Sequence, residues 1–223
     1  MTVIFSDGQV GSIMETAGNL SAWTGSGAKV SVVNTKPHHG VNSAYYNGSD
    51  WSENYKTLAA LPLASYRAYC VFAGNAIDGA SSGEESFMGF RDANFVDIAL
   101  ALLQKTPNGT YRWGVSLNAG GLSAYSSTFV LDKTKQYCIE LEAKIAATGG
   151  YAKLYVEDVL VASIVNVKTN ARGNIDMIDF CGWINKSWQM YLDCVVVANA
   201  HIGPESTVTQ KGRISIHAKL VAI

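Results

Sequence analysis

The sequence is poor in charged residues, and the charges it has are balanced. Charged side chains make up 16% of the 223 residues, where about a quarter is usual, and hydrophobic residues make up 48%. This composition excludes an intrinsically disordered chain and a coiled coil. Lys and Arg number 17 against 18 Asp and Glu, which gives a formal net charge of -1. The chain therefore has no excess of positive charge for a nucleic acid or an anionic membrane, and we expect neither as a partner.

Long hydrophobic runs and targeting signals are also missing. Apolar runs such as residues 195–198 fall far short of the roughly 20 residues of a membrane-spanning helix. Residues 1–7 lack the basic stretch and the apolar run of a signal peptide. We therefore expect no membrane insertion, and either a mature form or release by a route other than secretion. The location that fits this expectation is an extracellular surface or a virion.

The four cysteines have neither metal-binding nor redox spacing. Cys70, Cys138, Cys181 and Cys194 lie far apart, each within an apolar stretch. Buried free thiols behave as small hydrophobic side chains, and we favour this interpretation. Disulfides between neighbouring strands stay open as the alternative, because an even number of cysteines permits them.

The sequence does contain many short stretches that read as strands separated by turns. Residues 96–103 form an apolar stretch bounded by turn residues, which favours a buried strand over a helix. Asn108-Gly109 predicts a hairpin into a strand over residues 111–117. Further strands are predicted over residues 137–145, 152–156, 159–164, 175–183 and 191–198. A total of about ten to twelve strands predicts an all-β fold, a two-sheet antiparallel jelly-roll sandwich.

The predicted domain ends near residue 202. Gly203-Pro204 breaks the strand pattern, so residues 1–202 form the jelly-roll domain and residues 203–223 a linker with an extra C-terminal strand. Apolar and polar residues alternate over residues 213–223, as in a half-buried strand. This strand can pair at the edge of its own sandwich or be exchanged between subunits, which would make the protein a homo-oligomer.

Several landmarks follow one another in an order known from one group of folds. They are Phe5 with Asp7-Gly8, residues 20–25 (LSAWTG), 30–33 (VSVV), 39–44 (HGVNSA), 137–142 (YCIELE), 154–158 (LYVED) and 191–197 (YLDCVVV). Over about residues 3–202 the chain resembles the laminin-G-like, concanavalin A-like jelly-roll modules. Such modules are common in secreted polysaccharide-active proteins, microbial surface proteins and phage particles. The landmarks are structural, so the resemblance implies the fold far more than an activity.

The resemblance also implies a structural calcium ion between the start of the chain and the last strand of the domain. The matching positions are Asp7, the backbone carbonyl near Gly40, and Asp193. Calcium takes several oxygen ligands at about 2.3–2.6 Å. Asp193 lies in an apolar stretch, where an unpaired carboxylate would be costly to bury. The alternative is that Asp193 faces solvent or accepts backbone hydrogen bonds.

Enzymes of related folds use residue patterns that this sequence lacks. Glu140 and Glu142 share one strand face, but the longer acidic signature of laminarinase-type enzymes is missing, and we expect both on a solvated face. Lyases of this fold use a His and a Tyr with Arg and Gln. His38 and His39 lie in a turn, a poor position for a rigid catalytic base. We therefore expect no catalytic residues, and a polysaccharide-degrading enzyme (glycoside hydrolase or lyase) is the alternative.

Tryptophans in polar loops are the candidates for carbohydrate binding. Trp51 lies in one polar loop, and Trp183 and Trp188 bracket a second, whereas Trp23 and Trp113 are expected in the core. Sugar rings stack on exposed aromatic side chains without a titrating group; packing of the loops is the alternative role. We expect a non-catalytic surface recognition or structural module whose partner is a polysaccharide or glycan. A self-assembling virion or filament component is one version of this expectation.

Overall fold

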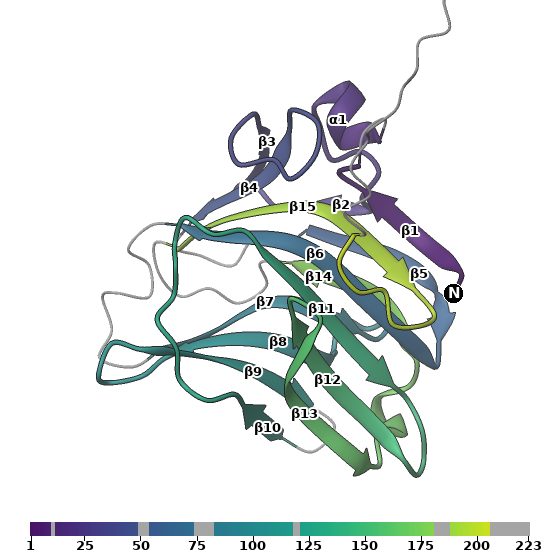
Figure 1. Cartoon of the computed structure of the whole chain (residues 1–223). Coiled ribbons are helices and arrows are strands. Elements are labelled where there is room, and N and C mark those ends of the chain that lie inside the picture. Colours follow the sequence, from purple (N-terminus) through teal and green to yellow (C-terminus); the bar gives the residue numbers. More distant parts are fainter. Residues whose placement is uncertain (10–11, 49–53, 74–82, 118–120, 181–187, 206–223) are drawn as a thin grey trace, which may run out of the picture.

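Two antiparallel sheets form a sandwich in the computed structural model, which describes residues 1–9, 12–48, 54–73, 83–117, 121–180 and 188–205 (Figure 1). Sheet A has the order β13-β12-β11-β6-β15-β4-β3, with β1 also paired to β15, and sheet B has the order β10-β9-β8-β7-β14-β5-β2. The strands of sheet A are β1 (Val3–Asp7), β3 (Val30–Val33), β4 (Ser43–Gly48), β6 (Leu63–Ala73), β11 (Tyr137–Lys144), β12 (Gly150–Val156), β13 (Val159–Val167) and β15 (Trp188–Ala198). Those of sheet B are β2 (Gly25–Ser26), β5 (Asn54–Leu61), β7 (Gly83–Arg91), β8 (Asp97–Lys105), β9 (Tyr111–Leu117), β10 (Leu122–Tyr125) and β14 (Ile175–Phe180).

The all-β sandwich predicted from the sequence is confirmed. The described residues form 15 strands, more than predicted, because short pairings such as β2 leave little trace in the sequence. One short helix, α1 (Ile13–Ala17), was not predicted. Ser12 caps its N-terminus, and Gly18 ends it in the left-handed conformation.

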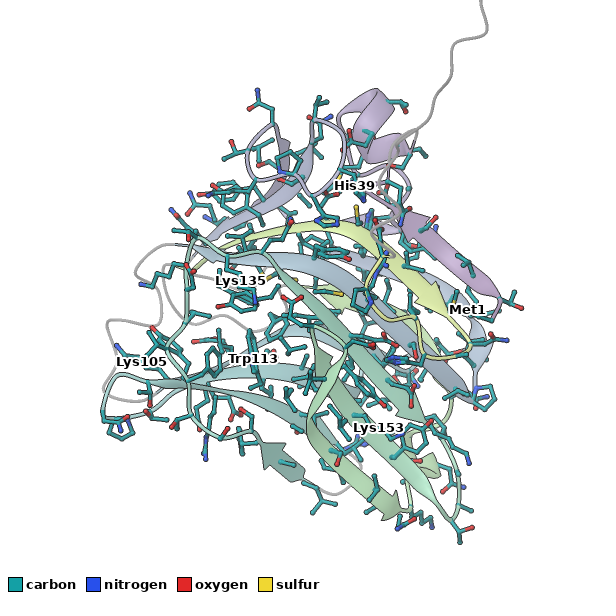
Figure 2. All side chains as sticks on the ribbon, in the orientation of Figure 1. Met1, His39, Lys105, Trp113, Lys135 and Lys153 are labelled. Atoms are coloured by element: carbon teal, nitrogen blue, oxygen red, sulfur yellow. The ribbon has the colours of Figure 1, made fainter. Side chains whose placement is uncertain are left out.

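Aromatic side chains fill the space between the sheets. Trp113 lies between them (Figure 2), with its ring centroid 5.6 Å from that of Phe72 and 5.5 Å from that of Tyr137. Trp23 packs edge-on against Phe180 at 5.3 Å. Trp23 is 6% exposed and Trp113 is 4% exposed, so the prediction that both are core residues is confirmed. Large aromatic side chains supply much of the burial that stabilises such a sandwich.

The hairpin predicted at Asn108-Gly109 is confirmed, and a second tight turn joins β12 to β13. Gly109 has a positive φ of 83° between β8 and β9, the conformation that an Asn-Gly turn supplies. Glu157 and Asp158 have positive φ values of 53° and 67° and form the two-residue turn between β12 and β13. These tight turns fix the strand register, which decides which side chains share a face.

Three of the four cysteines are described, and Cys70, Cys138 and Cys194 are buried free thiols, as predicted. Cys181 lies outside the described residues. The C-terminal strand also falls there, because the description ends at residue 205, so the domain boundary and the exchanged strand stay predictions. Among the described residues no helix is long and apolar enough to cross a membrane.

Candidate functional site

The outer face of sheet A, which points away from sheet B, carries an unusual set of polar side chains. Arg67 on β6 lies opposite Glu140 on β11, and Glu140 lies opposite Tyr155 on β12. Two residues further along, Ser65, Glu142 and Lys153 form the next row. Because alternate residues of a strand point to one face, these rows share the outer face. The residues between them, such as Tyr66 and Leu141, are fully buried in the core.

The segment after β15, residues 199–205, covers part of this face, and we call it the strap. Figure 1 shows it, in yellow, turning back across sheet A. The backbone N–H groups of Ile202 and Gly203 donate to the Glu140 carboxylate at 2.9 and 2.8 Å. Glu140 is 2% exposed and Glu142 is 6% exposed, so the prediction that both lie on a solvated face is wrong. The strap and the neighbouring side chains shield carboxylates that the strand pattern alone directs to solvent.

Arg67 and Glu205 form the centre of the covered region. The Arg67 side chain is 4% exposed, and its Nη2 donates to Oε1 of Glu205 at 2.8 Å. It also donates to the Cys194 carbonyl at 3.3 Å, and Nη1 donates to the Gly203 carbonyl at 3.4 Å. The Glu205 amide donates to the Tyr69 hydroxyl at 2.8 Å. The end of the strap is therefore attached to sheet A through a buried charge.

The turn that contains His38 and His39 covers the neighbouring part of the face. The His38 ring stacks on Tyr69 with centroids 3.5 Å apart and planes 10° apart. Its Nδ1 donates to Oε1 of Gln136 at 2.6 Å, and burial lowers the pKa of His38 below its usual value. Nε2 of His39 contacts the Glu205 carboxylate. Stacking and hydrogen bonds thus hold the His38 ring in place, and the absence of a catalytic base in this turn stays a prediction.

Asp193 on β15 holds the turn of His38 and His39 through hydrogen bonds. It is fully buried, and its Oδ2 accepts hydrogen bonds from the His38 and His39 amides at 2.5 and 3.1 Å. Its Oδ1 accepts from the Cys194 amide at 2.7 Å. Burial raises the pKa of Asp193 to about 6, although these hydrogen bonds oppose the rise. The alternative of a carboxylate that accepts backbone hydrogen bonds thus describes the contacts of Asp193.

Of the other two predicted calcium positions, Asp7 has similar partners. Asp7 is 1% exposed, and its oxygens accept from the Met14 amide at 3.2 Å and from the Trp23 indole at 3.1 Å. Next to Gly40, the Glu15 carboxylate accepts from the Val41 amide at 2.8 Å. The donors to Asp7 use lone pairs that a cation would also need. Calcium at this place stays a prediction.

A β-bulge at Cys194 explains why Val195 and Val197 pack inward although Asp193 faces outward. The pairing of β15 with β6 shifts between Asp193 and Val196, and Cys194 has a positive φ of 49°. The extra residue reverses the alternation, so Val195 and Val197 enter the core. The bulge therefore lets Val195 and Val197 pack in the core although Asp193, on the same strand, faces outward.

Two groups of half-buried aromatic side chains flank the covered region. Tyr45 and Tyr191 are register partners on β4 and β15, and their rings stack with centroids 4.7 Å apart. On β12, Tyr151 and Tyr155 lie on either side of Lys153, whose Nζ is 4.2 Å from the Tyr151 ring centroid. Figure 2 shows His39 beside the N-terminal elements and Lys153 towards the β12–β13 edge, so the two ends of the face are well separated.

The predicted carbohydrate-binding tryptophans are only partly within the described structure. Trp51 and Trp183 lie outside the described residues. Trp188 is the first residue of β15 and pairs with Gly48, the last residue of β4. The structure describes the backbone of Trp188 but not its side chain. The role of the three tryptophans stays a prediction.

His201 gives the strap a pH-dependent contact. Its Nδ1 lies 3.0 Å from Oε1 of Glu140 and its Nε2 lies 2.8 Å from Oδ1 of Asp158. Burial alone would lower the pKa of His201, but the Asp158 hydrogen bond and the nearby carboxylates outweigh it, and the pKa is raised above 6.5. A histidine whose pKa rises on folding stabilises the fold below its unfolded pKa and loses this contribution as pH rises through the folded pKa.

We therefore expect the wild type to be more stable than His201→Ala at pH 5.5, with a smaller difference at pH 8. The difference should stay below about 1 kcal/mol, because the imidazole is partly exposed. Urea unfolding of both proteins at the two pH values measures it. A difference that grows with rising pH would contradict this assignment.

Most of the residues at this site could not be predicted from the sequence. Arg67, Tyr69, Gln136 and Glu205 come from distant parts of the chain, and only the strand register and the return of the strap bring them together. One signal was available, because Arg67 is the sole charge in the otherwise apolar stretch of residues 63–73. A charge inside a fully buried strand indicates a partner on the same face.

Comparison with known proteins shows the fold but no family. No family model and no curated protein matches the chain. The solved structure of a cellulose induced protein, Cip1, is similar with a TM-score of 0.62 and 14% identity, covering 90% of this chain and 99% of that one. The alginate lyase Aly36B is similar with a TM-score of 0.55 and 10% identity, covering 92% and 95%. The receptor-binding domain of botulinum neurotoxin type G has a TM-score of 0.56 and 13% identity, covering 91% of this chain and 49% of that one. The jelly-roll sandwich is thus shared, and the narrower laminin-G-like assignment stays a prediction.

Proposed function

We propose that the protein is a non-catalytic carbohydrate-recognition module that binds a glycan along the outer face of sheet A. The observation that carries this proposal is the presence of half-buried tyrosines on both sides of the strap. Tyr45 and Tyr191 form a stacked pair on one side, and Tyr151 and Tyr155 frame Lys153 on the other. Half-buried aromatic rings present rigid apolar surfaces for sugar rings, and polar neighbours accept or donate to hydroxyl groups.

The names of similar structures support a role in recognition or in polysaccharide chemistry. One is a receptor-binding domain and another an alginate lyase, at 13% and 10% identity. The covered state of Arg67, Glu140 and Glu142 favours recognition over catalysis, because each of these groups already has a partner from the protein. Carbohydrate recognition fits an adhesive role at an extracellular or particle surface. A structural component that assembles through the C-terminal strand is one form of this hypothesis.

The proposal is tested with a panel of neutral and uronate-containing polysaccharides. Binding is measured by co-sedimentation with insoluble polymers and by calorimetry with soluble oligosaccharides. We expect Tyr191→Ala to weaken binding about tenfold, which corresponds to about 1.4 kcal/mol, because the stacked pair loses one ring. Tyr125→Ala is the matched control, since Tyr125 is a half-buried tyrosine on β10 of sheet B. Equal affinity of both variants and the wild type would contradict the proposed face.

A polysaccharide lyase is the second candidate, and one observation favours it. Arg67, Tyr69, His38 and Gln136, the residue types that lyases of this fold use, gather on one face. In the present arrangement the Tyr69 hydroxyl accepts a hydrogen bond from the backbone amide of Glu205, and burial raises the pKa of Tyr69 to about 12. A lyase leaves an unsaturated sugar at the new chain end, so ultraviolet absorbance during the same panel distinguishes the two. Absorbance that grows with time would establish the lyase, and binding without it supports recognition.

A further inference from the structure

Three side chains at the edge of the strap present metal-ligating atoms to one another. His38 and His39 come from the turn before β4, and Glu205 comes from the end of the strap. Each offers one ligand atom, and the three atoms lie within 4.8 Å of one another. Nε2 of His38 is 3.9 Å from Oε2 of Glu205, and Nε2 of His39 contacts the same oxygen. A carboxylate oxygen faces two imidazole nitrogens, so either an imidazole proton or a metal ion must lie between these electron pairs.

The hydrogen bond made by Nδ1 of His38 leaves its other ring nitrogen, Nε2, without a proton and facing Glu205. Its Nδ1 donates to Oε1 of Gln136 at 2.6 Å, and an amide oxygen can only accept. The neutral ring therefore keeps its lone pair on Nε2, the atom that faces Glu205. Histidine ligands of metals usually have their second nitrogen fixed in this way by an oxygen acceptor.

The other groups of the cluster are also held in place by neighbours. Asp193 accepts hydrogen bonds from both histidine amides, and Arg67 binds Oε1 of Glu205 at 2.8 Å, which leaves Oε2 for the histidines. The positive charge of Arg67 opposes a second cation. The Asp193 carboxylate beneath the same turn offsets it. The ligand atoms of a tetrahedral zinc site are about 3.3–3.5 Å apart, so small side-chain movements suffice to bring the three atoms to these separations.

We propose that His38, His39 and Glu205 form a binding site for zinc or a similar transition-metal ion that fastens the strap to the histidine turn. Two imidazoles with one carboxylate are a donor set that zinc accepts, whereas calcium prefers oxygen ligands alone. Three protein ligands leave the fourth position of a tetrahedral ion open to water or to a ligand oxygen. The site is separate from the calcium predicted at Asp7, Gly40 and Asp193, and it does not depend on the proposed function.

The proposal is tested by titrating the metal-stripped full-length protein with Zn²⁺ in a calorimeter, with Ca²⁺ as a parallel titrant. We expect saturable binding of one Zn²⁺ per chain and a rise in the thermal unfolding midpoint, and no effect of Ca²⁺ at this site. His39→Ala and Glu205→Gln should each weaken zinc binding more than tenfold. His39 is 45% exposed on its side chain, so its loss should leave the apo protein folded.

The control variants separate this cluster from its neighbour. His201→Ala removes the histidine of a second cluster with Glu140 and Glu142, and it should leave zinc affinity unchanged. Gln136→Ala should weaken binding about tenfold, and Gln136→Glu should retain it, because a carboxylate also accepts from Nδ1. If Gln136 had only a structural role, zinc affinity would not depend on whether residue 136 offers an oxygen acceptor to Nδ1 of His38.

Three results would overturn the proposal. One is the lack of saturable zinc binding, which would mean that a proton alone joins His39 to Glu205. Another is equal zinc affinity in the wild type and in His39→Ala. The third is a loss of binding in His201→Ala instead, which would place the ion at Glu140 and Glu142.

Discussion

Replacing Asp193 with alanine is expected to lower the free energy of unfolding by about 3–5 kcal/mol. Asp193 is fully buried and accepts hydrogen bonds from the backbone amides of His38, His39 and Cys194. Alanine leaves these three donors without their acceptor, and each buried unsatisfied donor costs about 1–3 kcal/mol. Removing a carboxylate whose pKa is raised to about 6 by burial recovers part of this cost. Urea unfolding at pH 7 measures the difference.

The matched variant and a chelator complete this test. Asp193→Asn keeps one carbonyl oxygen for the histidine amides but turns its own NH₂ towards the Cys194 amide, so we expect an intermediate loss. If the hydrogen bonds are responsible, the loss in Asp193→Ala persists in a calcium-selective chelator. If calcium is bound as predicted, the chelator lowers the free energy of unfolding of the wild type towards that of the variant. A loss below about 1 kcal/mol without chelator would contradict the role given to Asp193.

Replacing Glu140 with alanine is expected to cost about 3 kcal/mol and to release the strap. The Glu140 carboxylate is 2% exposed and accepts from the amides of Ile202 and Gly203. Hydrogen bonds to a buried charged group contribute about 1.5–3 kcal/mol each, and solvation of the released amides recovers some of this. Hydrogen exchange should show faster exchange of the strap amides, while the core strands β6 and β11 stay protected.

The control for this variant is a carboxylate with an exposed partner. Glu157 pairs with Lys135 at 3.3 Å, and their side chains are 42% and 48% exposed. Glu157→Ala should change the free energy of unfolding by less than about 1 kcal/mol. Unchanged exchange of the Ile202 and Gly203 amides in Glu140→Ala would show that the strap is held by something other than this carboxylate.

The fold could be predicted because its information is local. Alternation over residues 111–117 and the Asn108-Gly109 turn each act within a few residues, and both appear in β9 and its hairpin. The number of strands was underestimated, since pairs such as β2 with β5 depend on tertiary contact. The bulge at Cys194 was also out of reach, because nothing in the run of residues 193–198 marks the change of register.

The site could not be predicted because it depends on contacts between distant residues. The alternation of β11 correctly placed Glu140 and Glu142 on one face, but solvation was the wrong conclusion, since the strap returns 62 positions later to cover Glu140. Arg67 meets Glu205 at a separation of 138 residues. No rule of sequence spacing predicts a contact at that separation. The register of the sheet positions Arg67, and the hydrogen bonds of the strap position Glu205.

The measurement that tests the central claim most directly is amide hydrogen exchange with and without a bound oligosaccharide from the glycan panel. We expect added protection in β4, β12, β15 and the strap, around Tyr45, Tyr155 and Tyr191. The exchange of β8, β9 and β10 in sheet B should not change. Protection confined to sheet B, or a protein that binds no glycan in the panel, would contradict the proposal that the outer face of sheet A recognises carbohydrate.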